Sequence, residues 1–222
     1  MSTVQNILTS AQLKFGIDPS NIRFQSDFYD AINDSQDDIA NRRRWGFLRT
    51  TSDLSATQTS RTVALPDSFG KPYDARGAIR ITSPAANLGD TVQLMTLDEW
   101  TNDFYEDGST EGTPQYAYIL GSSLYLSPIP DAAYTIALIF YKRPTSIADT
   151  STAITVSSSY TELLRMMLYK RLQLAGWSSI QEIQIADSEV ERLINSAARD
   201  DISKFGGFSM NLPSSTYKRR TV

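Results

Sequence analysis

The sequence of 222 residues contains no cysteine and no histidine. Disulfide bonds are therefore impossible, and so is catalysis by a thiolate, by a Ser-His-Asp triad or by histidine proton transfer near neutral pH. Ordinary zinc sites are excluded too, because they use these residue types. An enzyme would have to use carboxylate, lysine, tyrosine or Mg²⁺ chemistry. We therefore expect no enzyme, no cofactor and no metal site.

Long hydrophobic runs are also missing, so we expect no membrane partner. The net charge is -4 and the pI is about 4.9, but the charge is unevenly distributed. Residues 205–222 contain Lys218, Arg219, Arg220 and no acidic residue, so this C-terminal segment carries a charge of +3. Because the whole chain carries -4, residues 1–204 carry -7. A basic tail on an acidic body suits an acidic protein partner or a phosphate backbone. A merely solvated terminus explains the same charges.

Two helices are predicted near the N-terminus. Apolar residues at helical spacing predict the first in "TVQNILTSAQLKFGI", with Gly16 as its stop. The second lies within "FQSDFYDAINDSQDDIANRRRWGF", with Ser26 as the expected N-cap. Its acid-to-base order, ending in Arg42, Arg43 and Arg44, complements the helix dipole.

Two further helices are predicted after residue 156. In "SSSYTELLRMMLYKRLQLAGW" the residues Ser159 and Glu162 have the spacing of a capping box. The last helix covers "SSIQEIQIADSEVERLINSAARDDISKF" and ends at Gly206 and Gly207.

The region from 47 to 156 has the short, alternating, Thr-rich texture of strands. A short helix is predicted in "MTLDEWTNDFYEDG", where Thr96 and Glu99 again have capping-box spacing. Residues 111–144 read as three strands, the first two joined near Gly121 and the last two joined across Pro128 and Pro130.

The predicted fold class is α+β, because strands and helices do not alternate along the chain. We expect a four-helix bundle of two N-terminal and two C-terminal helices, formed by residues 1–46 and 157–205. Residues 47–156 would form an inserted antiparallel β lobe with one short helix. Residues 206–222 would form an extended C-terminal arm, since this segment has little apolar content.

Two clusters of charge are candidate sites. A carboxylate hydrolase or a Ca²⁺ loop would need the acids between 98 and 107 to converge, with Glu99 and Asp103 as the candidate pair. Their helical spacing favours a solvated edge instead. The basic triplet 42–44 precedes Trp45 and could contact phosphates or stacked bases, although a helix C-terminus already explains its charge. Overall acidity argues against a tight DNA reader.

Three stretches together resemble the head-to-tail adaptor (connector) proteins of tailed bacteriophages. They are "TPQYAYILGSSLYLSPIPDAAYTIALIFYKRP", "YTELLRMMLYKRLQLAG" and "FYDAINDSQDDIANRRRWGFLR". The resemblance implies a structural virion protein that forms a homo-oligomeric ring, a dodecamer, beneath the portal protein. Such a ring extends the DNA channel, passes genomic DNA without sequence-specific binding and docks the tail or nozzle protein. It lies in the neck between capsid and tail and assembles in the host cytoplasm.

The resemblance also implies candidate contact residues. The C-terminal arm of the family docks onto the portal, which maps here to Phe208, Leu212, Tyr217, Lys218, Arg219 and Arg220. Contacts between subunits or with the tail are expected at Arg43, Arg44, Tyr125, Pro128, Pro130 and Tyr141. The alternative hypothesis is a distal tail or fibre-attachment protein that binds a partner protein or a glycan, with Trp100 and the strand tyrosines stacking on sugar rings.

Overall fold

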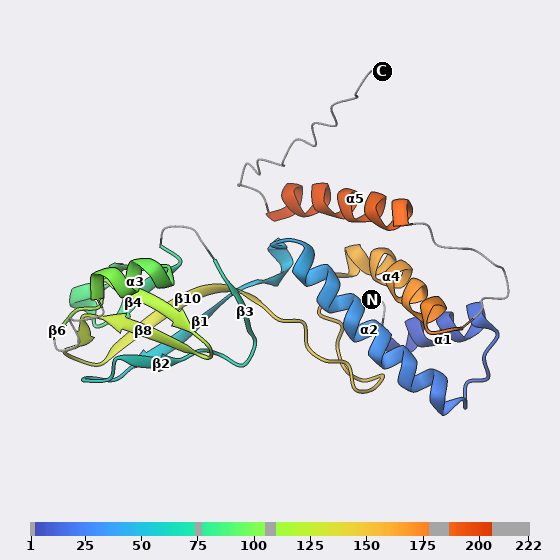
Figure 1. The fold of residues 1–222 in the computed structure, drawn as a ribbon, viewed down its shortest axis with the longest axis horizontal. Coiled ribbons are helices and arrows are strands. Elements are labelled where there is room, and N and C mark those ends of the chain that lie inside the picture. Colours follow the sequence, from blue (N-terminus) through green and yellow to red (C-terminus); the bar gives the residue numbers. More distant parts are fainter. Residues whose placement is uncertain (1–2, 74–76, 105–109, 178–186, 206–222) are drawn as a thin grey trace, which may run out of the picture.

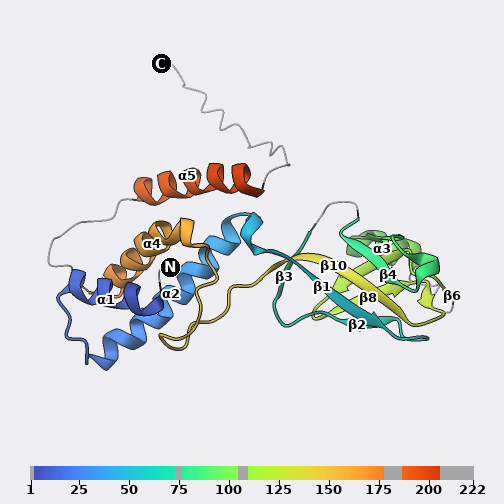
Figure 2. The same cartoon turned by 180° about the vertical axis from the view of Figure 1, so that it is seen from behind.

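The computed structural model describes residues 3–73, 77–104, 110–177 and 187–205. Most helices gather at one end of an elongated molecule, and the strands gather at the other (Figure 1). The view from behind shows the same division (Figure 2). The helices of the first end are α1 (Val4–Phe15), α2 (Ile22–Arg42), α4 (Thr161–Leu174) and α5 (Asp187–Phe205).

The first two helices have well-formed ends. The hydroxyl of Thr3 accepts a hydrogen bond from the Asn6 amide at 3.2 Å, and α1 stops at Gly16, whose φ of 64° is unstrained only for glycine. Asn21 caps α2 by accepting from the Phe24 amide at 3.0 Å. The predicted cap Ser26 is wrong, because the helix begins a turn earlier and Ser26 lies inside it.

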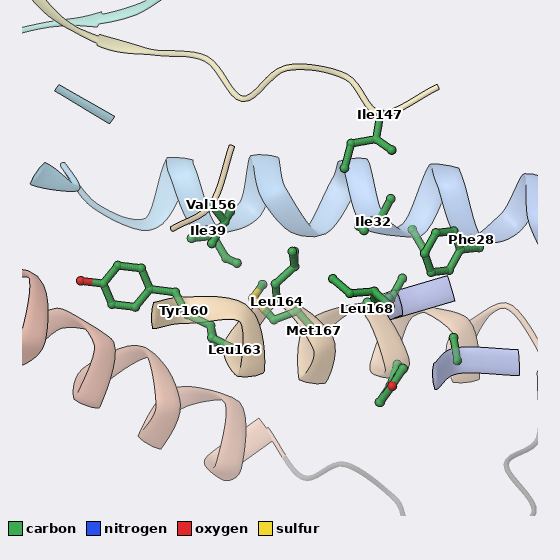
Figure 3. Close-up of a cluster of buried hydrophobic side chains, with 14 of the residues drawn as sticks. Phe28, Ile32, Ile39, Ile147, Val156, Tyr160, Leu163, Leu164, Met167 and Leu168 are labelled. Carbon is green, nitrogen blue, oxygen red and sulfur yellow. The ribbon is translucent and has the colours of Figure 1, made fainter. Parts of the chain in front are cut away.

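The helical core forms where α2 packs on α4. Phe28, Ile32 and Ile39 of α2 face Leu164 and Leu168 of α4, as Figure 3 shows. Each of these five side chains is at most 1% exposed. Burying a side chain of this size contributes about 1.5–3 kcal/mol, so this seam is the main source of stability for the helical end.

The chain returns from the strands to the helices along the side of α2. The amide of Asn33 donates to the Ile147 carbonyl at 3.0 Å, and its oxygen accepts from the Ile147 amide at 2.7 Å. One turn later the Gln36 side chain accepts from the Thr155 amide at 3.1 Å. These two side chains satisfy backbone groups that have no sheet or helix partner, and thereby hold the irregular segment against α2.

The sheet contains eight strands in the order β1-β10-β4-β5-β7-β8-β2, with β3 joined to β10. The terminal strands β1 and β2 contact each other, so the sheet is nearly closed, like a barrel. Its strands are β1 (Arg49–Ala56), β2 (Thr62–Ala64), β3 (Phe69–Pro72), β4 (Ile79–Ser83), β5 (Thr91–Leu94), β7 (Tyr116–Leu120), β8 (Ser123–Ser127) and β10 (Tyr134–Lys142). A separate pair joins β6 (Glu111–Gly112) to β9 (Ile129–Pro130).

The sheet has its own core. Tyr134, Ile136, Leu138 and Phe140 of β10 alternate with half-buried residues, which is the period of a strand with one face inward. Leu124 and Leu126 of β8 and Ile79 and Ile81 of β4 complete the interior from other strands.

The predicted fold class is wrong. The described residues form five helices and a large, nearly closed mixed sheet, where a four-helix bundle with an inserted antiparallel β lobe was expected. The mixed character arises at β5 and β7, which pair in parallel. The helix α3 (Leu97–Phe104) lies between them in the chain, and a connection of that length lets the chain cross over and re-enter the sheet in the same direction.

Two further local predictions are corrected. The turn near Gly121 does join β7 to β8, but β8 and β10 are not partners across Pro128 and Pro130. Instead β8 lies between β7 and β2, while β10 lies between β1 and β4. At the start of α4, Ser159 makes no cap, because the 3-10 turn η3 (Ser158–Tyr160) leads directly into the helix.

Candidate functional site

The predicted contact residues fall into three places. The arm residues Phe208, Leu212, Tyr217, Lys218, Arg219 and Arg220 lie outside the described residues. Tyr125, Pro128 and Pro130 lie on β8 and β9 and the residue between them. Arg43, Arg44 and Tyr141 lie together, around a groove between the helical end and the sheet.

This groove, called the basic groove below, has a volume of about 350 Å³. It is lined by the end of α2, by the 3-10 turn η1 (Gly46–Leu48), by β3 and by the end of β10 with the residues that follow. Five lining residues are basic and one, Asp37, is acidic. The basic residues are Arg43, Arg44, Lys71, Lys142 and Arg143.

The helical wall of the basic groove is fixed by Trp45. The indole is fully buried, and its Nε1 donates to the Ile39 carbonyl at 2.5 Å. The chain leaves the helical conformation at Arg43, whose φ is -163°, and its guanidinium lies 5.1 Å from the Trp45 ring centre. Arg43 and Arg44 therefore occupy a corner whose direction the anchored tryptophan determines.

The sheet wall is fixed by the pairing of β3 with β10. Tyr141 lies opposite Lys71, and the register shifts between Tyr141 and Lys142. A Cβ at Gly70 would lie 2.7 Å from the Tyr141 carbonyl oxygen, so only glycine fits where the two backbones approach. The ammonium of Lys71 donates to the Asn41 carbonyl at 3.3 Å and ties this wall to α2.

The charge of the basic groove is exceptional for this chain. Five basic residues and one acid give it +4, whereas the whole chain carries -4. Cations that lie near one another raise the local positive potential. Salt screens this potential, because Arg44 and Arg143 are exposed.

The second set, on β8 and β9, has a different character. Tyr125 and Pro128 are half-buried, and Pro130 is buried. Trp100, the predicted sugar platform, is only 8% exposed and stacks on Tyr118 at 5.8 Å between ring centres. The Trp100 ring is therefore part of the packing.

The predicted carboxylate pair does not form a described site. Glu99 accepts hydrogen bonds from the amide and the hydroxyl of Thr96, each at 2.8 Å. These bonds lower the pKa of Glu99, the backbone bond most, and mark it as the capping partner that the spacing predicts. The side chain of Asp103 lies outside the described residues. Nowhere in the described ranges do three acidic side chains gather as they would to hold a metal ion.

One polar cluster was missed by the sequence reasoning. Asp201 of α5 is only 4% exposed, and its carboxylate accepts from the Gly46 amide at 2.8 Å. Burial, and then the charges of Asp201 and Asp200, raise the pKa of Tyr160 to about 12. The sequence pattern could have indicated that Asp201 is buried, because Asp201 follows the buried residues Val190, Ile194 and Ala197 at helical spacing.

The chain matches the family model of the SU10 adaptor protein over residues 2–206. The chain therefore belongs to the SU10 adaptor protein family, and it is a structural adaptor component of a bacteriophage. No curated protein matches the chain. In the described ranges, no helix combines the length and the apolar character needed to cross a bilayer.

Proposed function

We propose that the chain is the subunit of a ring, a dodecamer, that binds beneath the portal protein in the neck of the virion. The ring extends the DNA channel and offers the platform on which the tail or nozzle protein docks. The observation that carries the proposal is the match to an adaptor family over residues 2–206. Assembly takes place in the host cytoplasm, before the tail is attached.

The charge distribution supports this role. The net charge of -4 disfavours a tight grip on the phosphates of passing DNA, because DNA binding depends on their neutralisation. A channel wall that does not bind phosphates lets the genome move through without stalling.

The portal contact is assigned to residues 206–222. Lys218, Arg219 and Arg220 supply positive charge, and Phe208, Leu212 and Tyr217 supply apolar and aromatic surface.

The test is to mix the full chain with the portal ring of the same phage and to follow co-sedimentation and electron micrographs. A second ring stacked coaxially on the portal is expected. Reversal of Lys218, Arg219 and Arg220 to Glu should abolish it. Reversal of three exposed arginines elsewhere changes the charge equally and should leave it intact; these controls are Arg23, Arg80 and Arg199.

Two other results would change the proposal. If the rings still stack after the charges of Lys218, Arg219 and Arg220 are reversed, or after residues 206–222 are removed, the contact with the portal belongs to the folded body. If the chain does not bind the portal at all, the proposed role is wrong and a distal position in the tail becomes the better hypothesis.

A further inference from the structure

The sheet has an open edge at β5. Val92 of β5 lies opposite Ile79 of β4, and beyond Val92 no described strand pairs with β5 on this side. The residue that would continue the register opposite Leu94 is Gly77, but its φ of 81° takes the chain out of the strand conformation. The Gly77 carbonyl accepts instead from Nε of Arg80 at 3.1 Å. Among the described strands, the second half of β5 therefore has a partner only on the side of β7.

The hydrogen bonds of β5 show which backbone groups face the open side. The amide of Gln93 donates to the Gln115 carbonyl, next to β7, at 2.8 Å. The amide of Met95 donates to the Ala117 carbonyl of β7 at 2.8 Å. Successive residues of a strand direct their backbone groups to opposite sides, so the N–H and C=O of Leu94 point away from β7. These two groups can pair with one more strand.

The open edge lies in a groove of about 800 Å³, called the β5 groove below. Its walls are the end of β3, residues 77–80 and residues 91–96. Half-buried apolar surface comes from Pro72, Tyr73, Leu94 and Met95. An open strand edge between apolar walls suits an extended segment in which apolar and polar side chains alternate.

The C-terminal segment contains such a pattern. Residues 208–212 read "FSMNL", in which three apolar residues alternate with two polar ones. The apolar side chains of this segment would share one face of a strand. Pro213 follows and has no N–H to donate, so the pattern ends where strand pairing would also end.

This segment begins near one wall of the β5 groove. The helix α5 ends at Phe205, which packs against Gly46 so closely that no Cβ fits there. From Gly46, η1 leads to Arg49, whose guanidinium lies 5.7 Å from the centre of the Tyr73 ring in the groove wall. Figures 1 and 2 both show α5 ending over the junction between the helical end and the sheet. The groove that this segment meets first is therefore that of its own copy.

We propose that residues 208–212 add to the edge of β5 as a further strand of the same copy, in the chain that has not yet met the portal. Leu94 then bonds to the added strand, and Phe208, Met210 and Leu212 pack on the apolar walls. The proposed function assigns Phe208 and Leu212 to the portal, and they cannot make both contacts at once. The β5 groove therefore holds the arm until the portal displaces it.

The amide of Leu94 provides the test. Its hydrogen exchange is measured by NMR in the full chain and in a chain that ends at Phe205. Removal of the arm should speed exchange at Leu94 by about tenfold, as for an edge that is occupied about nine-tenths of the time. The amides of Gln93 and Met95 bond on the side of β7, so they are internal controls and should be unchanged.

A matched pair of variants of the full chain tests the strand geometry. Met210→Asp with Leu212→Asp places two charges on the face that meets the groove, and should speed exchange at Leu94 as truncation does. Ser209→Asp with Asn211→Asp adds the same charge on the opposite face, and should leave exchange at Leu94 as in the natural chain.

The absence of cysteine allows a single label to locate the arm. Met210→Cys carries a photo-activated cross-linker, and the adducts are mapped by mass spectrometry. An adduct within one copy, on residues 77–80 or 91–96, is expected. In the co-sedimented complex with the portal ring, the adduct should move to the portal.

The inference is overturned if Leu94 exchanges equally in the full and truncated chains, or if the two double variants behave alike. An adduct that joins two copies, or that lies outside the β5 groove, also overturns it. An adduct that stays in the groove of the portal complex would contradict the displacement. The exchange measurements need no portal, so a chain that fails to bind the portal refutes the proposed function and leaves this test unaffected.

Discussion

Tyr160 provides a pH-dependent test of how α5 docks. Its side chain is 2% exposed, and burial with the nearby charges of Asp201 and Asp200 raises its pKa from the ordinary 10 to about 12. Between these two values the unfolded chain loses the tyrosine proton while the folded chain keeps it. The free energy of unfolding must therefore fall as the pH rises from 10 to 12. A displacement of about 2 pKa units corresponds to about 2.7 kcal/mol.

The assay is urea unfolding at several pH values from 8 to 12, with Tyr160→Phe as the comparison. At pH 8 the two proteins should differ by no more than about 1 kcal/mol. Other groups that titrate, including Tyr134, affect both proteins alike, so the difference between the curves isolates Tyr160. The variant should lose less stability than the natural chain above pH 10. If the two curves stay parallel up to pH 12, Tyr160 does not lie buried beneath the acids of α5.

Three substitutions test other parts of the structure. Gly46→Ala places a Cβ 2.4 Å from the Cβ of Phe205 and should lower the free energy of unfolding by about 1–3 kcal/mol. The control Gly112→Ala places a Cβ no nearer than 3.6 Å to any other atom and should change the free energy of unfolding little. Equal effects of the two substitutions would refute the close packing of α5. Leu164 is 0% exposed, so Leu164→Ala should lower the free energy of unfolding, measured with denaturant, by about 2–5 kcal/mol. Leu174 is 79% exposed, so Leu174→Ala should lower it by less than about 0.5 kcal/mol. A mild effect at Leu164 would contradict the packing of α2 on α4. Thr96→Ala removes the hydroxyl bond to Glu99 and keeps the larger effect of the Thr96 amide, so the pKa of Glu99 should rise only part of the way toward its ordinary value in an NMR titration. An unchanged pKa would show that the Thr96 hydroxyl does not bond to Glu99.

Local signals predicted local structure well. Apolar spacing located the helical segments, and the capping box at Thr96 and Glu99 is confirmed because both partners lie within one turn. The same spacing failed at Ser159, where a 3-10 turn replaces the cap, and Ser26 failed because Asn21 was the better-placed polar residue. A capping pattern identifies a residue able to cap, and the tertiary structure selects the one that does.

Pairing between distant segments was not predictable in the same way. Strand periodicity does not determine which strands are neighbours, so the pairing of β10 with β1 and the parallel pairing of β5 with β7 were both missed. The arginines at 43 and 44 and Tyr141 were singled out separately, from a charge run and a strand. Their meeting in one groove depends on the anchor at Trp45 and on the fit at Gly70, which act across the chain.

The most direct test of the adaptor role is an electron cryo-microscopy reconstruction of the virion neck. We expect a ring of this chain immediately beneath the portal, with residues 206–222 on the portal. Density for the chain only at a distal position in the tail would contradict the proposed function.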